Sequence, residues 1–314
     1  MKAVRCCSHE KRVEVVDIPA PRGEGVRVKV RSAGICGSDL HMVDAGYPIT
    51  STLGHEVAGT LSDGRTVALE PLSPCGHCDR CQAGDYGMCR LSARMIHGVG
   101  LDGGMAEEIL VPERSIVPLP DSVSVADACL VEPLAVAAHG IRRLSLDART
   151  RVAIIGAGPV GLCAAALCVP CAGEVSIAAR HDAQKIAAEK LGARLDPEGE
   201  FDVVIECAGT SDAVAMAVRL CRPRGCLLLL ATYWYGLQIP ANEVSMKNLR
   251  IEASSLYSQQ GLARDVDIAA QLLGRYPHIA GALISHRLPL DAAAEAFAIA
   301  ANRRAGAIKV VLEP

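Results

Sequence analysis

The sequence reads RVAII-GAGPVG from Arg151 to Gly161, an apolar segment followed at once by three glycines spaced G-x-G-x-x-G. The first glycine allows a tight turn, the second leaves room for a pyrophosphate, and the third lets a helix pack closely on the strand. The N-terminus of that helix offers free N–H groups to phosphate. The stretch therefore predicts a dinucleotide site at Gly156, Gly158, Pro159, Val160 and Gly161.

Downstream of this turn, apolar strand segments alternate with helical ones. Such alternation requires right-handed crossovers and gives a parallel sheet covered by helices. The composition agrees, because 50% of the residues are apolar but only 3% are aromatic, so the cores must be aliphatic. We therefore expect an α/β chain with a doubly wound parallel sheet domain over residues 139–274. Its predicted strands are 151–155, 175–179, 201–206 and 226–230, and its predicted helices are 159–169 and 183–191.

The first third of the chain has a different sequence pattern. Residues 12–17 and 26–31 alternate between apolar and polar side chains, as half-buried strands do. Glycine and proline then interrupt the chain almost to residue 120, and residues 125–144 have a helical pattern. The last stretch, 284–313, reads as strand, helix and strand. We expect residues 1–138 and 275–314 to form one β-rich domain.

Four cysteines follow the spacing C-x2-C-x2-C-x7-C in a glycine-containing loop. Short loops of this kind let four thiolates close around one tetrahedral Zn²⁺. The alternative is four unrelated thiols among the 14 of the chain. We expect a structural zinc lobe over residues 73–92, and its closed ligand set leaves no position for a substrate. The predicted ligands are Cys75, Cys78, Cys81 and Cys89.

A second metal site is indicated by Cys36, His55 and Glu56, each with a glycine close by in the sequence. Thiolate, imidazole and carboxylate all bind zinc, and three protein ligands leave one coordination position open. Taken alone, Cys36 could be a core thiol and His55 a packed histidine. Their combination with a dinucleotide turn downstream favours a catalytic zinc.

The end of the second predicted strand bears on the choice of dinucleotide. An NAD site usually has Asp or Glu there to bind the ribose hydroxyls, but this chain has Ala179 followed by Arg180. Arg180 could bind a 2′-phosphate bidentately. The alternative is that Arg180 is a solvated loop charge and Asp182 binds the ribose. We predict NADP rather than NAD.

Charge and hydropathy exclude several classes of protein. The net charge is -3, so the chain has no excess of basic residues that would indicate binding to nucleic acid or to an acidic membrane. The uncharged stretch 152–173 is long enough to cross a bilayer, but its glycines and prolines favour a buried strand, turn and helix. The 14 cysteines and the lack of an apolar leader fit a reducing compartment, and we expect a cytoplasmic protein.

These motifs occur together in a known family. The segments 36–39 (CGSD) and 54–56 (GHE), the four-cysteine lobe and the GAGPVG turn resemble the zinc-dependent medium-chain dehydrogenases, the alcohol dehydrogenase superfamily. Residues 131–136 (VEPLAV) are similar to the sorbitol and threonine dehydrogenase branch, in which a glutamate replaces a thiolate. The resemblance covers nearly the whole chain. It implies a GroES-like catalytic domain, a Rossmann domain and a homodimer or homotetramer.

The resemblance also implies roles for single residues. Cys36 and His55 would bind the catalytic zinc, with Glu56 or Glu132 as the third protein ligand. Zn²⁺ with one thiolate and one carboxylate is neutral, and a second carboxylate would weaken its acidity. We therefore expect only one glutamate to bind zinc directly when substrate is present. The remaining roles are Ser38 as proton acceptor, His41 as proton carrier to solvent, and Asp39 as the group that orients His55.

The implied activity is hydride transfer between a secondary alcohol and a nicotinamide cofactor, giving a ketone. A polyol, amino-alcohol or sugar-like substrate would suit the Glu132 branch. One alternative is a zinc-independent quinone or enone reductase-like enzyme on the same fold, and another is a non-catalytic NADP-binding protein. The presence of Cys36, His55 and Ser38 disfavours both alternatives.

Overall fold

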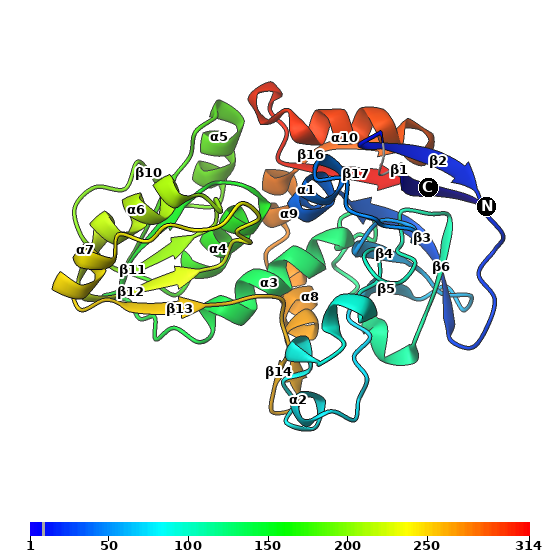
Figure 1. Ribbon diagram of the computed structural model, residues 1–314, viewed down its shortest axis with the longest axis horizontal. Coiled ribbons are helices and arrows are strands. Elements are labelled where there is room, and N and C mark those ends of the chain that lie inside the picture. The colour runs from blue at the N-terminus through cyan, green and yellow to red at the C-terminus, as the bar shows by residue number, and fades with distance from the viewer. Residues whose placement is uncertain (8–9) are drawn as a thin grey trace. The chain divides into compact units, whose positions relative to one another are not determined.

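The computed structural model describes residues 1–7 and 10–314 and is a mixed α/β structure (Figure 1). The chain forms two compact units: Met1–Glu132 together with Ser258–Pro314, and Pro133–Tyr257. The first is called the catalytic unit below, and the second is called the nucleotide unit. The sequence predicts that the chain re-enters the first domain at residue 275. That residue is the last of α8 (Asp265–Arg275), and the whole of α8 belongs to the catalytic unit, which the chain re-enters at Ser258.

The nucleotide unit contains a six-stranded parallel sheet in the order β10-β9-β8-β11-β12-β13. The chain starts in the middle at β8, moves outward to β10 and then fills the other side from β11. This is the doubly wound topology that the sequence predicts, and its switch point lies between β8 and β11. The strands are β8 (Arg151–Ile155), β9 (Glu174–Ala178), β10 (Arg194–Leu195), β11 (Phe201–Glu206), β12 (Cys221–Leu229) and β13 (Arg250–Ala253).

Helices follow the strands of this sheet (Figure 1). Gly158 is the N-cap of α4 and Pro159 is its first residue, a position where the missing N–H of proline costs nothing. The same helix ends at Cys168, one residue before the predicted end, because Pro170 has no backbone N–H to continue its hydrogen-bond pattern. The helices that lie wholly in this unit are α4 (Pro159–Cys168), α5 (Asp182–Lys190), α6 (Ser211–Leu220) and α7 (Ala241–Met246).

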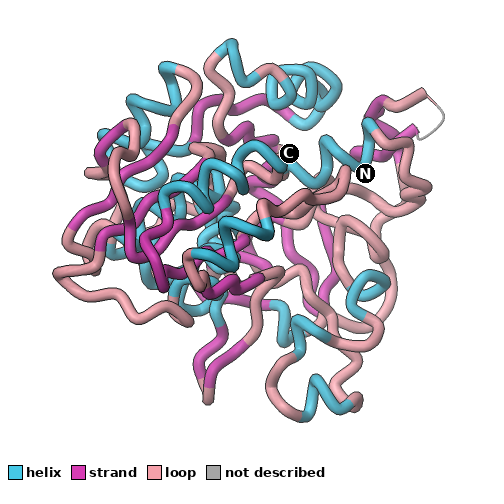
Figure 2. The backbone as a smooth tube through the Cα atoms, turned by 60° about the vertical axis from the view of Figure 1, so that its left-hand side comes forward, coloured by secondary structure: helices cyan, strands magenta, loops and turns pink. Residues whose placement is uncertain are grey.

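The catalytic unit is built on a mostly antiparallel seven-stranded sheet in the order β16-β17-β3-β4-β5-β7, with β6 also paired to β3. Loops make up much of the chain between its short strands (Figure 2). The strands of this sheet are β3 (Val26–Gly34), β4 (Glu56–Thr60), β5 (Thr66–Leu69), β6 (Glu108–Val111), β7 (Ile116–Pro118), β16 (Ile284–Pro289) and β17 (Lys309–Glu313). Two separate hairpins are β1 (Lys2–Cys7) with β2 (Arg12–Asp17), and β14 (Gln259–Gln260) with β15 (Ala263–Arg264).

The helix predicted from residue 125 begins only at Val131, because a 3₁₀ turn, Ala128–Leu130, precedes it. Pro133 then lies within the first helical turn, where a proline does not break the hydrogen-bond pattern. This helix, α3 (Val131–Ile141), places Glu132 at its start, and from Pro133 onward it belongs to the nucleotide unit. The helices that lie wholly in the catalytic unit are α1 (Gly37–Asp44), α2 (Asp79–Gln82), α8, α9 (His278–Leu283) and α10 (Ala293–Ala301).

The uncharged stretch 152–173 forms most of β8, the glycine turn and α4. Among the residues that the structure describes, no helix is long and apolar enough to cross a membrane.

Candidate active site

The first metal-ligand candidate lies where β3 passes into α1. Cys36 is the N-cap of α1, and its backbone N–H donates to Asp39 Oδ2 over 2.9 Å. Asp39 is fully buried, which raises the pKa of its carboxyl group, while His55 and the Cys36 N–H act in the opposite direction. The turn therefore fixes the Cys36 backbone and holds a buried carboxylate beside it.

His55 enters this site from the residue before β4. Gly54 makes the approach possible with a φ of +100°, and a Cβ there would lie 2.6 Å from the Met105 backbone nitrogen. His55 Nδ1 lies 3.5 Å from Asp39 Oδ1, and both atoms are buried. Burial lowers the pKa of His55, but Asp39 and Cys36 outweigh it and raise that pKa well above its usual value. Asp39 therefore lies behind the His55 ring, on the side where metal-binding histidines usually have a carboxylate partner.

Glu56 is the first residue of β4 and pairs with Gly34 of β3. A Cβ on Gly34 would overlap Glu56 Oε2, so only glycine leaves room for this carboxylate. Lys309 of β17, the strand on the other side of β3, places its Nζ 2.6 Å from Oε1 and 2.5 Å from Oε2. Both side chains are 1% exposed. Burial opposes the charge of Lys309, but Glu56 and Cys36 hold its pKa above the ordinary value.

Sequence reasoning missed Lys309. A signal was available, because Lys309 is the single charge inside the apolar run 307–312 (AIKVVL) of the last predicted strand. A charge in a buried strand requires a buried partner of opposite sign.

The ligand atoms of Cys36, His55 and Glu56 all lie within 4.8 Å of one another. His55 and Glu56 are buried and Cys36 is partly buried. A set of thiolate, imidazole and carboxylate suits zinc better than Mg²⁺ or Ca²⁺, which prefer oxygen ligands. Three of the four predicted catalytic ligands are therefore together. The fourth, Glu132, is buried at the start of α3 and close enough for its charge to act on His55, but it lies outside this group.

The two predicted proton-transfer residues lie on α1. Ser38 Oγ is 3.3 Å from His55 Nε2, the ring nitrogen opposite the one that faces Asp39. His41 is one turn further along α1 and half-buried. Burial and the nearby Arg303 guanidinium lower the pKa of His41. Arg303 is a second residue near the site that sequence reasoning did not find.

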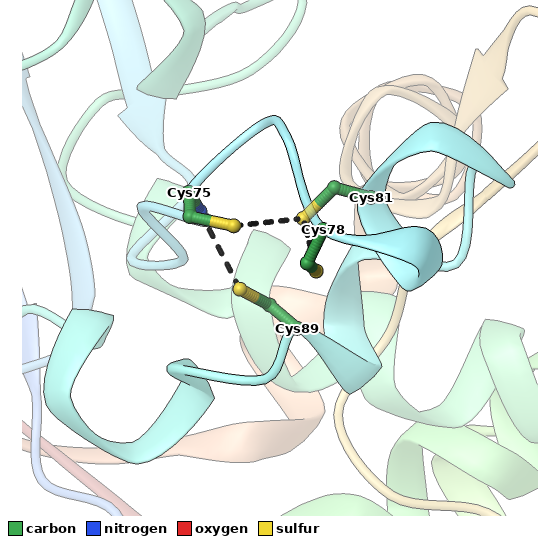
Figure 3. Close-up of side chains that lie close together, drawn as sticks. All are labelled: Cys75, Cys78, Cys81 and Cys89. Atoms are coloured by element: carbon green, nitrogen blue, oxygen red, sulfur yellow. Dashed lines mark hydrogen bonds between the residues drawn. The ribbon is translucent and has the colours of Figure 1, made fainter.

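The four lobe cysteines converge as predicted (Figure 3). Cys78 Sγ lies 3.5 Å from Cys81 Sγ, and Cys75 Sγ lies 3.9 Å from it. Sulfurs at the corners of a ZnS₄ tetrahedron are about 3.8 Å apart, given Zn–S bonds of about 2.3 Å. Backbone N–H groups of Arg90 and Cys81 donate to Cys78 and lower its pKa to about 6, which favours the thiolate that zinc needs. All four sulfurs lie within 4.8 Å of one another, so they could serve as the ligands of one ion.

A buried polar cluster joins this lobe to the rest of the catalytic unit. Tyr86 OH donates to Glu70 Oε1 over 2.5 Å and lies 3.1 Å from the carbonyl oxygen of Ser258. Arg264 Nη1 donates to the other Glu70 oxygen over 3.1 Å. These contacts do not involve the cysteines, so they hold the lobe in place independently of a metal.

The glycine turn of the nucleotide unit has the geometry that its sequence predicts. Gly156 has a φ of +103°, and a Cβ on Gly161 would overlap the Gly156 carbonyl oxygen. Arg180 lies two residues after the end of β9 and is exposed, and it makes no hydrogen bond or ion pair with any described residue. The nearby Asp182 is exposed as well and lies 4.0 Å from Lys185.

Glu206 ends β11 in the same unit and is buried. Its Oε1 accepts hydrogen bonds from the N–H groups of Ala208 (2.7 Å) and Gly209 (2.8 Å), while Tyr233 OH donates to Oε2 over 2.6 Å. Tyr233, one of three consecutive aromatic residues, therefore shapes a loop at the carboxyl edge of the sheet. Its neighbour Tyr235 is 77% exposed.

This fold and this site define a zinc-binding alcohol dehydrogenase. Residues 22–121 match the alcohol dehydrogenase GroES-like domain, and residues 159–271 match the zinc-binding dehydrogenase domain. The chain belongs to the zinc-type medium-chain dehydrogenase family and is an oxidoreductase of that family.

Relatives and solved structures agree over nearly the full length. Galactitol 1-phosphate 5-dehydrogenase of Escherichia coli K12 is 30% identical over 92% of each chain. L-galactonate-5-dehydrogenase of the same organism is 29% identical over 90% of this chain and 89% of its own.

Two solved structures show the same fold with cofactor. A Sinorhizobium meliloti 1021 protein described as a zinc-binding dehydrogenase, bound to NADP, is 30% identical with a TM-score of 0.84, covering 100% of this chain and 99% of its own. An Escherichia coli CFT073 alcohol dehydrogenase with NADH is 25% identical with a TM-score of 0.87 and the same coverage.

Proposed function

We propose that this dehydrogenase oxidises a secondary alcohol of a polyol or sugar-like substrate to a ketone, with its chemistry at Cys36, His55 and a glutamate. The family membership supports the reaction class, which is alcohol-to-ketone conversion with a nicotinamide cofactor. The names of two relatives specify a polyol phosphate and a sugar acid. Substrates of this kind, including charged ones, are therefore the first to test.

The proposed metal content is two zinc ions per chain, one in the lobe and one at the catalytic site. Cys36, His55 and Glu56 support the catalytic site because their ligand atoms already lie together. When bound, zinc supplies the positive charge that acidifies the substrate hydroxyl, and the cofactor supplies the hydride acceptor.

We keep the proposal that one glutamate at a time binds this zinc directly. Lys309 occupies both oxygens of Glu56, so a metal must share those oxygens with the lysine. Glu132 is the alternative ligand in charge terms, because Lys309 neutralises Glu56, while the charges of Glu132 and Cys36 would together balance Zn²⁺. This arrangement lets Glu132 take the third ligand position while Glu56 stays paired with Lys309.

The observation that carries the proposed mechanism is the 3.3 Å distance from Ser38 Oγ to His55 Nε2. With Nδ1 facing Asp39, Nε2 is the nitrogen left for the metal, so Ser38 lies beside the position where a substrate hydroxyl would bind. Ser38 accepts the hydroxyl proton there. His41, half-buried one turn along α1, passes the proton to solvent.

For the cofactor we propose NADP over NAD. Arg180 is exposed two residues after β9, makes no ion pair with a described residue, and has no carboxylate next to it in the chain. A 2′-phosphate would meet a free guanidinium there rather than the usual acidic side chain. We also propose a homodimer or homotetramer, which family resemblance alone supports and light scattering would test.

The experiment is an activity screen of the zinc-loaded protein with NADP⁺ and NAD⁺. The panel contains polyols, polyol phosphates, sugar acids and amino alcohols. A Ser38→Ala variant should lose about 10²-fold in kcat on the best substrate, because one proton-transfer group is removed. An unchanged kcat in this variant would contradict the assigned role. Absence of turnover with every alcohol would contradict the proposed function.

A further inference from the structure

Arg303 has an unusual environment for a guanidinium. It lies in the 3₁₀ turn Arg303–Ala305 that follows α10, and its Nη1 is buried without a hydrogen-bond partner. Among the described residues, no carboxylate lies within ion-pair distance of it. A buried, unpaired N–H of a charged group is costly, so such a group usually has a partner in the functional state.

The guanidinium faces the catalytic site. Its Nη2 is 4.0 Å from the position that a Cβ on Gly37 would take. Apart from the chain neighbours of Gly37 and its own helix backbone, no other atom of the described residues lies within 4 Å of that position, so there is open space beside the guanidinium. The charges of Arg303 and Cys36 interact, and Arg303 also acts on His41.

The other buried cation at this site is not available. Lys309 is already paired with both oxygens of Glu56 and with the carbonyl oxygen of Ile35. Among the described residues, Arg303 is a cation near Cys36 whose Nη1 is buried without a hydrogen-bond partner. Its neighbour Arg304 has the same charge and is exposed to solvent.

We propose that Arg303 is the oxyanion-binding residue of the catalytic unit. It binds a carboxylate or phosphate of a molecule that enters the space beside Gly37. This inference rests on the proposed function. The oxyanion has two possible sources, the substrate and the phosphates of the cofactor, and each predicts a different result.

The test compares Arg303→Met with Arg304→Met, which removes the same charge from the adjacent exposed position. For both variants and the wild-type holoenzyme, kcat/KM is measured on a neutral polyol and on the sugar acid and polyol 1-phosphate of the same carbon chain. The dissociation constant of the reduced cofactor is measured separately by its fluorescence. Zinc content and the melting temperature control for folding.

If the oxyanion belongs to the substrate, Arg303→Met should lose about 10–100-fold in kcat/KM on the charged substrates only. This is the loss expected for one charge-assisted hydrogen bond. If the oxyanion belongs to the cofactor, the cofactor dissociation constant of Arg303→Met should rise by a similar factor, whichever substrate is used. Either result supports the proposal if Arg304→Met stays near wild type. The proposal is overturned if Arg303→Met behaves like Arg304→Met in both assays.

Two further measurements keep the test decisive. If Arg303→Met does not fold, Arg303→Lys keeps the charge but not the planar fork, and it should show a smaller loss in the same assay. If the wild type turns over no alcohol, the proposed function fails while this inference can still be judged. Calorimetric titration of inorganic phosphate and of the cofactor into wild type and variant must then show weaker binding to the variant, and equal binding refutes the inference.

Discussion

Lys309 Nζ lies within hydrogen-bond distance of both carboxylate oxygens of Glu56, at 2.6 and 2.5 Å, and the two side chains are almost completely buried. The pair joins β17 to β4 across Gly34 of β3, whose missing side chain makes the space for it. Lys309 thereby neutralises the charge of Glu56, which is itself one of the predicted metal ligands. The charge balance of the site consequently includes a cation that the metal-binding motifs do not contain.

Removing this cation should destabilise the protein. Lys309→Met leaves a buried carboxylate without its partner, which costs about 3–5 kcal/mol in the free energy of unfolding. Denaturant unfolding of the zinc-loaded protein measures this loss. The double variant Lys309→Met/Glu56→Gln has no buried charge at this position and should recover most of the stability. Equal stability of the single and double variants would show that the pair does not hold the site together.

The zinc lobe should be separable from catalysis. Cys89→Ser removes one of the four thiolates, so it should lower the zinc content by one ion per chain and destabilise the protein. The remaining folded enzyme should keep its kcat, because Tyr86 and Glu70 hold the lobe without the metal. Cys171→Ser, at an exposed cysteine outside the lobe, is the control and should change neither quantity. Zinc loss from both variants alike would refute the lobe assignment.

Arg180 should set the preference between the two dinucleotides. Arg180→Met should raise KM for NADP⁺ by about 10–100-fold, because a charge-assisted contact to the 2′-phosphate is lost, and should change KM for NAD⁺ little. Steady-state kinetics with both cofactors measures the ratio. Lys190→Met, at the other end of α5, is the matched control for charge. If the ratio of KM for NADP⁺ to KM for NAD⁺ were unchanged in Arg180→Met, the role of Arg180 would be contradicted, and Asp182 would be left as the ribose ligand.

His41 should control the acidic side of the pH profile. Burial and Arg303 lower its pKa below the usual 6.5, so the imidazole stays neutral and able to accept a proton down to more acidic pH. The kcat for alcohol oxidation should therefore fall only as pH drops below 6.5. His41→Asn should abolish this limb and lose about 10²-fold in kcat, with partial rescue by added imidazole. A limb that persists unchanged in His41→Asn would assign it to another group.

Much of the fold could be predicted from the sequence because local signals and tertiary structure agree there. The apolar run 151–155 and the glycines after it specify strand, turn and helix without reference to the rest of the chain, and β8 and β11 have the predicted bounds. The helix predicted from residue 125 was wrong at its start, since a 3₁₀ turn and a helix give the same short-range periodicity.

The candidate site was predictable only in part. The cysteine spacing predicts its own cluster, because those ligands are close in sequence, and Cys36 with His55 follow from local motifs. Lys309 and Arg303 come from the far end of the chain and reach the site through strand order and a turn after α10. No local pattern encodes that proximity, although a lysine in a buried strand indicates that an acidic partner is buried beside it.

The most direct test of the account is the zinc content of the wild type and of Cys36→Ser, measured by elemental analysis on protein purified without chelator. The account predicts two zinc ions per chain in the wild type. It predicts one in Cys36→Ser, with the lobe zinc retained. One ion per wild-type chain that Cys36→Ser leaves unchanged would contradict a catalytic metal at Cys36 and His55, and the roles assigned to Ser38 and His41 would fall with it.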